Sequence, residues 1–254
     1  MLLTILGSGT AIPVPDRFPA GYLLQTQTAQ VLIDCGPGVL RRLVQAGGDL
    51  HKLDAVLLTH YHTDHCADLA ALLFALRSPN FANRKPMHLF GAPGLLRLVQ
   101  KLTEAWPWLQ PRGYELELHE VLPGTFPLAD LEVTAVPIRH TAQSLGYRCT
   151  TAAGSVAFSG DADECEELVL LARDTDVFVC DAATPDDEKL DGHLTPGLAA
   201  RHAARAATHK LVLTHFYPAC DGHDLRAEAK AHYDGPIVLA EDLQRIPIGQ
   251  PDWG

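Results

Sequence analysis

The 254-residue chain has little positive charge and no long apolar run. It carries 20 Lys and Arg against 31 Asp and Glu, a formal net charge of −11 at pH 7. Contact with nucleic-acid phosphates needs a track of Lys and Arg, so the bulk charge disfavours long RNA or DNA as a partner. The longest apolar run, around Leu69 to Leu76, is far short of the ~20 residues that a membrane span needs, and we expect no membrane partner.

Paired cysteines are also missing. The chain has 6 cysteines, which form no CxxC pair and show no regular spacing. This pattern predicts reduced thiols and no disulfide framework. The N-terminal stretch MLLTILGSGTAIP lacks the basic region of a secretory signal peptide and soon turns to Gly and Pro. We therefore expect a soluble, cytoplasmic protein.

Short apolar or alternating runs bounded by Gly, Pro and Asp predict strands, and apolar residues at three- and four-residue steps predict helices. The predicted strands are Leu2–Leu6, Tyr22–Thr26, Val31–Ile33, Ala55–Leu58, Glu115–Val121, Leu131–Val136, Gly146–Thr150, Ser155–Phe158, Val177–Cys180 and Lys210–Leu213. The predicted helices are Val39–Ala46, Cys66–Arg77, Gly94–Ala105, Glu164–Ala172 and one from an N-cap at Thr195 through about Ala207. Strand blocks interleaved with helices in two halves predict an α/β (α+β) architecture, two packed sheets with helices outside. The length suits one domain over residues 1–254.

The stretch LLTHYHTDH, residues 57–65, places three histidines and an aspartate directly after an apolar run. Reactive groups of α/β folds lie at such strand ends. His60 and His62 are two positions apart and can share one face, while a turn lets Asp64 and His65 point elsewhere. Imidazole nitrogen and carboxylate oxygen suit Zn²⁺, Mn²⁺ or Fe²⁺. The spacing therefore predicts one metal held by the first pair and a second metal held by the other pair.

Three further candidate ligands each follow a later predicted strand, by a short turn or by a small polar residue. They are His140 after Leu131–Val136, Asp161 in FSGDAD after Ser155–Phe158, and His215 in LVLTHF after Lys210–Leu213. A lone histidine after a strand is more often a hydrogen-bonded core group, but the three together with the local cluster favour a dinuclear centre. Other histidines, among them His88, His119 and His202, follow no ligand pattern, and we expect them at the surface or at helix caps.

This constellation resembles the metallo-β-lactamase superfamily. The match runs nearly end to end, through LGSGT, LIDCGPG, THYHTDH, His140, SGDAD and LTHF. The resemblance implies an αββα sandwich of two mixed sheets flanked by helices. It also implies a ligand set, in which His60, His62 and His140 hold one metal, Asp64, His65 and His215 hold the other, and Asp161 bridges them.

Two positions separate this chain from other branches of the superfamily. True β-lactamases have a cysteine at the bridging position, which is Asp161 here, and flavo-diiron oxidoreductases have a glutamate in place of His62. The hydrolase branch remains, with two divalent metal ions as cofactors, Zn²⁺ first and Mn²⁺ or Fe²⁺ as alternatives. Two such ions with Asp64 and Asp161 leave a charge of about +2, which suits a small anionic substrate such as a phosphodiester.

The C-terminal half resembles ribonuclease Z and its small phosphodiesterase relatives. Asp181-Ala182-Ala183-Thr184 and His193-Leu194-Thr195 match the acidic-Ala-Thr stretch and the His-Ser/Thr loop of that branch. The resemblance implies that His193 lies beside the scissile phosphate, where an imidazole protonates the leaving oxygen or stabilises the phosphoryl oxygens. It implies a second role for Asp64, which accepts the proton of the attacking water.

Two features depart from the transfer-RNA-processing enzyme of this branch. That enzyme carries a long arm between the equivalents of His140 and Asp161, which only residues 141–160 separate here. Its basic loop of the form Pro-x-Lys-x-Arg-Asn is here Pro13-Val14-Pro15-Asp16-Arg17-Phe18, which keeps Arg17 but has neither the Lys nor the Asn. Together with the net charge, these departures disfavour RNA.

The sequence thus predicts a dinuclear metal-dependent hydrolase, a phosphodiesterase in which a metal-bridging hydroxide attacks a small or cyclic phosphodiester. Three alternatives stay open. The first is a ribonuclease Z-like endonuclease that cuts RNA at its 3′ end without the arm, as a homodimer. The second is a hydrolase of sulfate esters, lactones or phosphotriesters. The third is a metal-dependent sensor or scaffold that kept the ligands and lost turnover.

Overall fold

Two seven-stranded sheets form the computed structural model, which describes residues 1–82 and 84–249. The first sheet, in spatial order, consists of β14 (Arg245–Pro247), β1 (Leu2–Gly7), β2 (Gly21–Gln25), β3 (Gln30–Ile33), β4 (Leu53–Leu57), β5 (Met87–Gly91) and β6 (Leu116–Glu120). The second consists of β13 (Ile237–Leu239), β12 (Leu211–Thr214), β11 (Val177–Asp181), β10 (Gly154–Phe158), β9 (Leu145–Thr151), β8 (Leu131–Pro137) and β7 (Gly124–Leu128).

Each sheet is mixed in the same way. In the first sheet the pairs from β14 to β3 are antiparallel and the pairs from β3 to β6 are parallel. In the second sheet the pairs from β7 to β10 are antiparallel and the pairs from β10 to β13 are parallel. Parallel neighbours end at the same edge of a sheet, so residues that follow β4, β10, β11 and β12 are brought to one side of the molecule.

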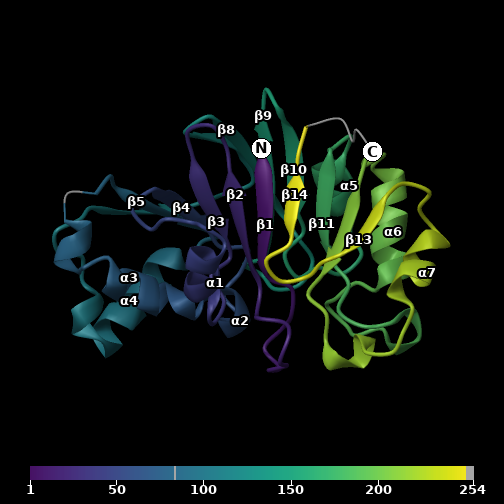
Figure 1. The fold of residues 1–254 in the computed structure, drawn as a ribbon, viewed down its shortest axis with the longest axis horizontal. Coiled ribbons are helices and arrows are strands. Elements are labelled where there is room, and N and C mark those ends of the chain that lie inside the picture. The colour runs from purple at the N-terminus through teal and green to yellow at the C-terminus, as the bar shows by residue number, and fades with distance from the viewer. Residues whose placement is uncertain (83, 250–254) are drawn as a thin grey trace.

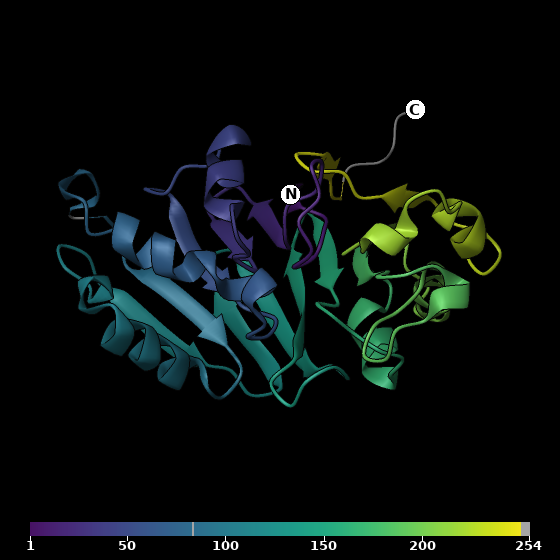
Figure 2. The same cartoon turned by 90° about the horizontal axis from the view of Figure 1, so that it is seen from below.

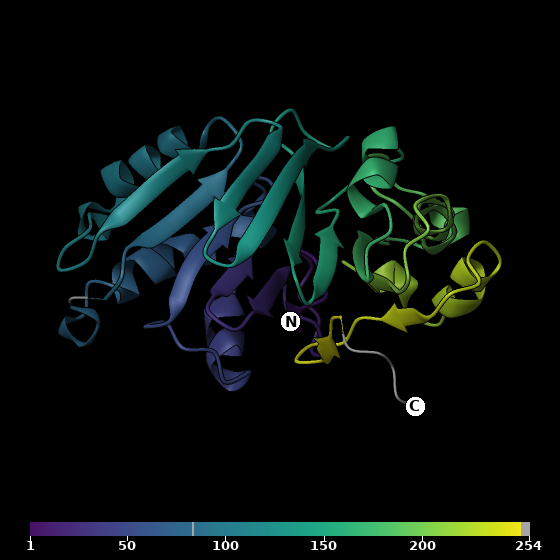
Figure 3. The ribbon, with the colours of Figure 1, turned by 90° about the horizontal axis from the view of Figure 1, so that it is seen from above.

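Helices cover both outer faces. On the first half lie α1 (Val39–Gln45), α2 (Thr63–Cys66), α3 (Asp68–Ala75) and α4 (Leu95–Ala105), and on the second lie α5 (Glu166–Ala172), α6 (Pro196–Arg205) and α7 (Leu225–Lys230) (Figure 1). Short 3₁₀ helices occupy Pro79–Phe81, Pro107–Leu109, Asp186–Glu188 and Pro218–Cys220. The helices of the first half stand in front of their strands when seen from below (Figure 2) and behind them when seen from above (Figure 3). This arrangement confirms the predicted αββα sandwich.

The central strands of the first sheet have apolar side chains on both faces. One face packs against the second sheet and the other face packs against helices. In β3, Val31 and Ile33 belong to the cluster between the sheets, while Leu32 packs with α1 and α3. The cluster between the sheets draws on strands of both halves. One domain over residues 1–254 stays a prediction, and residues 83 and 250–254 lie outside the described part of the chain. None of the helices in the described ranges is long and apolar enough to cross a membrane.

The predicted helix Cys66–Arg77 is confirmed over α3 (Asp68–Ala75), while Cys66 ends the preceding turn α2. The peptide groups of Cys35 lie between the two helices and take hydrogen bonds that would otherwise continue from α2 into α3. Cys35 N donates to His65 O over 2.6 Å, and Asp68 N donates to Cys35 O over 3.0 Å. The separate turn α2 carries Asp64 and His65 inward, both of them buried.

The sequence pattern did not predict four strands and one helix that the structure contains, namely β5, β7, β13, β14 and α7. β7 contains Pro127, which has no N–H to donate, and lies at the edge of its sheet, where a proline is tolerated.

The prediction that His202 is a surface or cap residue is wrong. Its side chain is buried in α6, and Nδ1 hydrogen-bonds Leu198 O over 2.9 Å.

Candidate metal centre

All seven predicted ligands gather at one end of the sandwich. Each follows the carboxyl end of a strand or lies in the turn that comes after it: His60, His62, Asp64 and His65 after β4, His140 after β8, Asp161 after β10, and His215 after β12. Strands far apart in the sequence therefore supply one cluster, as the repeated strand-then-ligand pattern predicts.

The first group consists of His60, His62, His140 and Asp161, with ligand atoms that all lie within 4.8 Å of one another. His140 Nε2 lies 3.2 Å from His62 Nδ1. Asp161 Oδ2 lies 3.6 Å from His60 Nε2 and 3.7 Å from His140 Nε2. His62 is exposed, so the group opens to solvent on that side.

The second group consists of Asp64, His65 and His215. His65 Nε2 and His215 Nε2 are 3.3 Å apart, and Asp64 Oδ2 lies 3.5 Å from His215 Nε2. Asp161 reaches this group with its other oxygen, because Oδ1 lies 3.1 Å from His65 Nε2 and 3.3 Å from His215 Nε2. The carboxylate of Asp161 thus stands between the two groups with one oxygen toward each.

The donor atoms of both groups fit divalent metal ions. Ligands about 2.1 Å from a tetrahedral ion are about 3.4 Å apart, close to the separations in both groups. His60 Nε2 and Asp161 Oδ1 are buried and have no hydrogen-bond partner among the described residues. An unpartnered buried polar atom costs about 1–3 kcal/mol, which a bound cation would offset. Nitrogen and carboxylate oxygen donors match zinc, the metal typical of this fold.

Two buried carboxylates that the sequence did not single out as functional hold the ligand histidines. Asp34 Oδ2 accepts from His65 Nδ1 over 2.7 Å, and Asp34 Oδ1 accepts from Thr59 N over 2.7 Å. Asp181 Oδ1 lies 3.5 Å from His215 Nδ1. An acceptor at Nδ1 keeps the proton there and turns Nε2 toward the cluster.

His193, the predicted proton donor, lies against both groups. Its ring centroid is 4.9 Å from that of His140 and 5.4 Å from that of His215. His193 Nδ1 pairs with Asp181 Oδ2 at 2.9 Å. Burial alone would lower the pKa of His193, but the hydrogen bond to Asp181 and the charges of Asp181 and Asp161 together outweigh burial and raise it.

Without a bound metal ion, the ligand side chains shift one another's pKa values. Burial and the neighbouring His65 lower the pKa of His60 to about 2. Burial alone would also lower the pKa of His215, but the carboxylates of Asp161 and Asp181 outweigh it and raise the pKa to about 10. Burial would raise the pKa of Asp64, but the hydrogen bond with His215 and the charges of His65 and His215 together bring it down to about 2. Metal binding therefore competes with protons at the second group.

A hollow of about 420 Å³ adjoins Asp64, with mostly apolar walls that include Pro13, Phe18 and Pro37. The wall segment is fixed by Asp242, whose side chain is 2 % exposed and accepts from Phe18 N over 2.8 Å. Arg17, the one basic residue retained in this loop, donates to Ser8 Oγ and Ala240 O, both over 2.7 Å. Arg17 therefore braces the loop from within.

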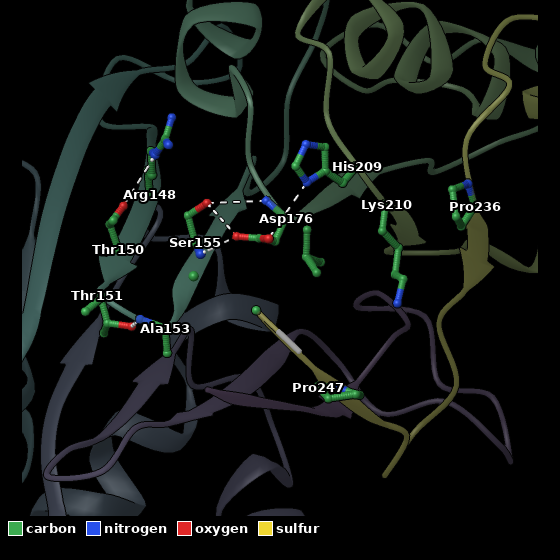
Figure 4. A pocket seen from close by; sticks show the side chains of 14 residues that line it. Arg148, Thr150, Thr151, Ala153, Ser155, Asp176, His209, Lys210, Pro236 and Pro247 are labelled. Carbon is green, nitrogen blue, oxygen red and sulfur yellow. Dashed lines mark hydrogen bonds and ion pairs between the residues drawn. The ribbon is translucent and has the colours of Figure 1, made fainter. Parts of the chain in front are cut away.

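A second cavity, of about 470 Å³, lies at the opposite end of the second sheet, where β10, β11 and β12 begin (Figure 4). Its carboxylate, Asp176, accepts from the backbone N of Ser155 over 2.8 Å and from the Ser155 hydroxyl over 3.2 Å. None of the predicted ligands lines this cavity. The candidate metal ligands therefore lie at the other end of the sandwich, away from this cavity.

Comparison with known proteins places these features in a family. Residues 29–216 match the family model described as the beta-lactamase superfamily domain. The chain is 31% identical to a protein named Ribonuclease Z of Mycobacterium bovis, over 97% of this chain and 98% of that protein. Human tRNase Z, short form, superposes with a TM-score of 0.81 at 25% identity, covering 98% and 99% of the two chains. The metallo-beta-lactamase fold protein YhfI of Bacillus subtilis gives a TM-score of 0.84 at 24% identity, covering 96% and 98%.

Proposed function

The chain belongs to the metallo-β-lactamase superfamily, in its ribonuclease Z-like and phosphodiesterase branch, and we propose that this hydrolase is a phosphodiesterase acting on a small or cyclic phosphodiester. One observation carries the proposal. Asp161 presents one oxygen to each of two ligand groups, and His193 stands beside both of them. Such a pair of cation positions next to a proton donor suits in-line displacement at phosphorus.

The proposed ligands are His60, His62 and His140 for one ion, Asp64, His65 and His215 for the other, and Asp161 for both. The expected cofactors are two divalent cations, preferably Zn²⁺, with Mn²⁺ or Fe²⁺ as alternatives. Such ions would act as Lewis acids on the phosphoryl oxygens and would lower the pKa of the attacking water. Asp34 and Asp181 keep the ligand imidazoles oriented.

Proton transfer is assigned to two residues of the chain. Asp64 accepts the proton of the attacking water, since its carboxylate lies beside the second group, with Oδ2 3.5 Å from His215 Nε2. His193 donates a proton to the leaving oxygen. Asp181 occupies Nδ1 of His193, so Nε2 is left for the substrate.

The surroundings of the centre favour a small substrate. The hollow beside Asp64 has about 420 Å³ and mostly apolar walls, the size of a small-molecule site. Residues 141–160, where the arm of the transfer-RNA-processing enzyme would be, run through the β9–β10 hairpin and its approach. Arg17 is the one basic residue among the described residues that line the hollow beside Asp64, and its side chain hydrogen-bonds Ser8 Oγ and Ala240 O. These features support a small phosphodiester over a long polyanion.

The test is a substrate panel at defined metal content. We expect turnover of bis-p-nitrophenyl phosphate and of cyclic nucleotides that a chelator abolishes and Zn²⁺ restores. His193→Gln should lower turnover at least about 100-fold while metal content stays unchanged. Full metal loading with no turnover of any phosphodiester would refute the proposal and favour a sensor or scaffold. Faster turnover of a sulfate ester, lactone or phosphotriester would move the assignment to that alternative.

An RNA endonuclease is the second candidate, and the name of the relative that is 31% identical over 97% of the chain favours it. A precursor transfer RNA belongs in the same panel for this reason. Accurate cleavage at its 3′ end, faster than cleavage of any small diester, would replace the first proposal.

A further inference from the structure

Three titratable side chains meet at the far edge of the first sheet, away from the centre described above. His88 lies on β5, and Glu117 and His119 lie on β6, the last strand of that sheet. The parallel register places His88 beside Glu117 and Phe90 beside His119. Since alternate residues of a strand share a face, all three side chains point to the same side of the sheet.

We infer that His88, Glu117 and His119 form a second, independent site for one divalent transition-metal ion, Zn²⁺ first. Their ligand atoms make a closed triangle. His88 Nδ1 lies 3.2 Å from His119 Nε2 and 3.4 Å from Glu117 Oε2, and the third side, His119 Nε2 to Glu117 Oε2, is 3.6 Å. Three ligands on one face of a tetrahedral zinc ion are about 3.4 Å apart, so one ion fits the triangle without movement of the strands.

The neighbouring side chains hold the triangle in place. Phe90 stacks on the His119 ring, with centroids 4.4 Å apart and planes at 14°. Phe126 of β7 stacks on the other side of Phe90, at 5.0 Å and 14°. Packing that fixes the plane of an imidazole lowers the entropy cost of ordering that side chain when it binds a metal ion.

The site is open enough to exchange metal. The side chains of its three residues are between 29 % and 40 % exposed. His88 and His119 also line a hollow of about 680 Å³ between β5, β6 and the β6–β7 connection. A solvent molecule in that hollow can complete the coordination sphere.

The donor set selects the kind of ion. Two imidazole nitrogens with one carboxylate favour Zn²⁺, Fe²⁺, Ni²⁺ or Cu²⁺, whereas Ca²⁺ and Mg²⁺ prefer oxygen ligands. The site shares no residue with either group of the main centre. A bound ion would tie the edge strand β6 to β5 by side chains, in addition to their backbone pairing.

The experiment is a Zn²⁺ titration of chelator-stripped full-length protein, read as bound metal after desalting and by competition with a chromophoric chelator. We expect His119→Gln and Glu117→Gln to bind one equivalent fewer than wild type and to keep the hydrolytic rate unchanged. His223→Gln, which removes an exposed histidine outside the triangle, should bind as wild type does. The Asp161→Asn variant should lose metal at the main centre. It should still bind the one equivalent of Zn²⁺ that the His119→Gln variant lacks.

Co²⁺ provides a second readout that does not depend on stoichiometry. The difference spectrum between wild type and His119→Gln should contain one set of visible ligand-field bands. Equal metal content and identical Co²⁺ spectra for wild type, His119→Gln and Glu117→Gln would overturn the inference and leave the triangle as a hydrogen-bonded cluster.

Discussion

Replacing Asp34 by Asn tests whether ligand orientation controls the metal centre. Asp34 uses one oxygen for Thr59 N and the other for His65 Nδ1 and Thr59 Oγ1, at 2.7 to 2.8 Å. An asparagine has one oxygen only. If its NH₂ faces His65, the ring must carry its proton on Nε2, which then cannot bind metal. If its oxygen faces His65, the NH₂ meets the N–H of Thr59, and two buried donors oppose each other.

Either arrangement leaves a buried group unsatisfied, which costs about 1–3 kcal/mol. Since 1.4 kcal/mol corresponds to a factor of ten, we expect Asp34→Asn to weaken metal binding at the second group about 10–100-fold. Competition with a chromophoric chelator measures this, and unfolding of the chelated protein separates lost binding from lost stability. Asp130→Asn is the matched control, because that exposed carboxylate bonds only the neighbouring Thr26 and Thr28 side chains and its own backbone. Metal affinity of Asp34→Asn within about twofold of wild type would refute the orienting role.

Three more predictions concern the same centre. Asp64→Ala should lower turnover at least about 100-fold even where metal remains bound, and near wild-type kinetics in a metal-quantified preparation would argue against its proton-acceptor role. Gly36→Ala should impair activity and lower the melting temperature, because a Cβ there would lie 2.0 Å from Asp64 O; an active, equally stable variant would contradict this packing. The raised His215 pKa, about 10 against an ordinary 6.5, contributes stability to the metal-free protein that is fully present below pH 6.5 and lost as the pH rises toward 10. Denaturant unfolding in chelator at pH 6.5 and 9.5 should show that fall, whereas a His215→Gln protein should show a smaller fall, because the pKa values of His65 and His193 are raised as well.

The positions of the candidate ligands could be predicted because their signals are local. An apolar run followed within four residues by a His or Asp recurs at His140, Asp161 and His215, and each run became a strand that ends at the cluster. The αββα architecture itself came from the family resemblance, since strand count alone gave no pairing order.

Other features depend on contacts between distant segments and left no local pattern. Asp34 and His65 are separated by 30 intervening positions and meet only once β3 and β4 are paired. His88 and His119 looked unremarkable in sequence because their relation is set by the register of two parallel strands. The break between α2 and α3 is another case, since the Cys35 peptide that causes it comes from a different loop.

The pairing of β1 with β14 has a consequence for synthesis of the chain. β1 is made first, but one of its edges stays open until residues 245–247 leave the ribosome. Asp242, which fixes the wall beside Asp64, is made almost as late, and so is the ligand His215. Nascent chains therefore expose one unpaired edge of β1 for most of translation, a stage at which chaperones or proteases can act on them. A chain interrupted just before residue 242 would contain all seven proposed ligands but would lack Asp242, which fixes the wall beside Asp64.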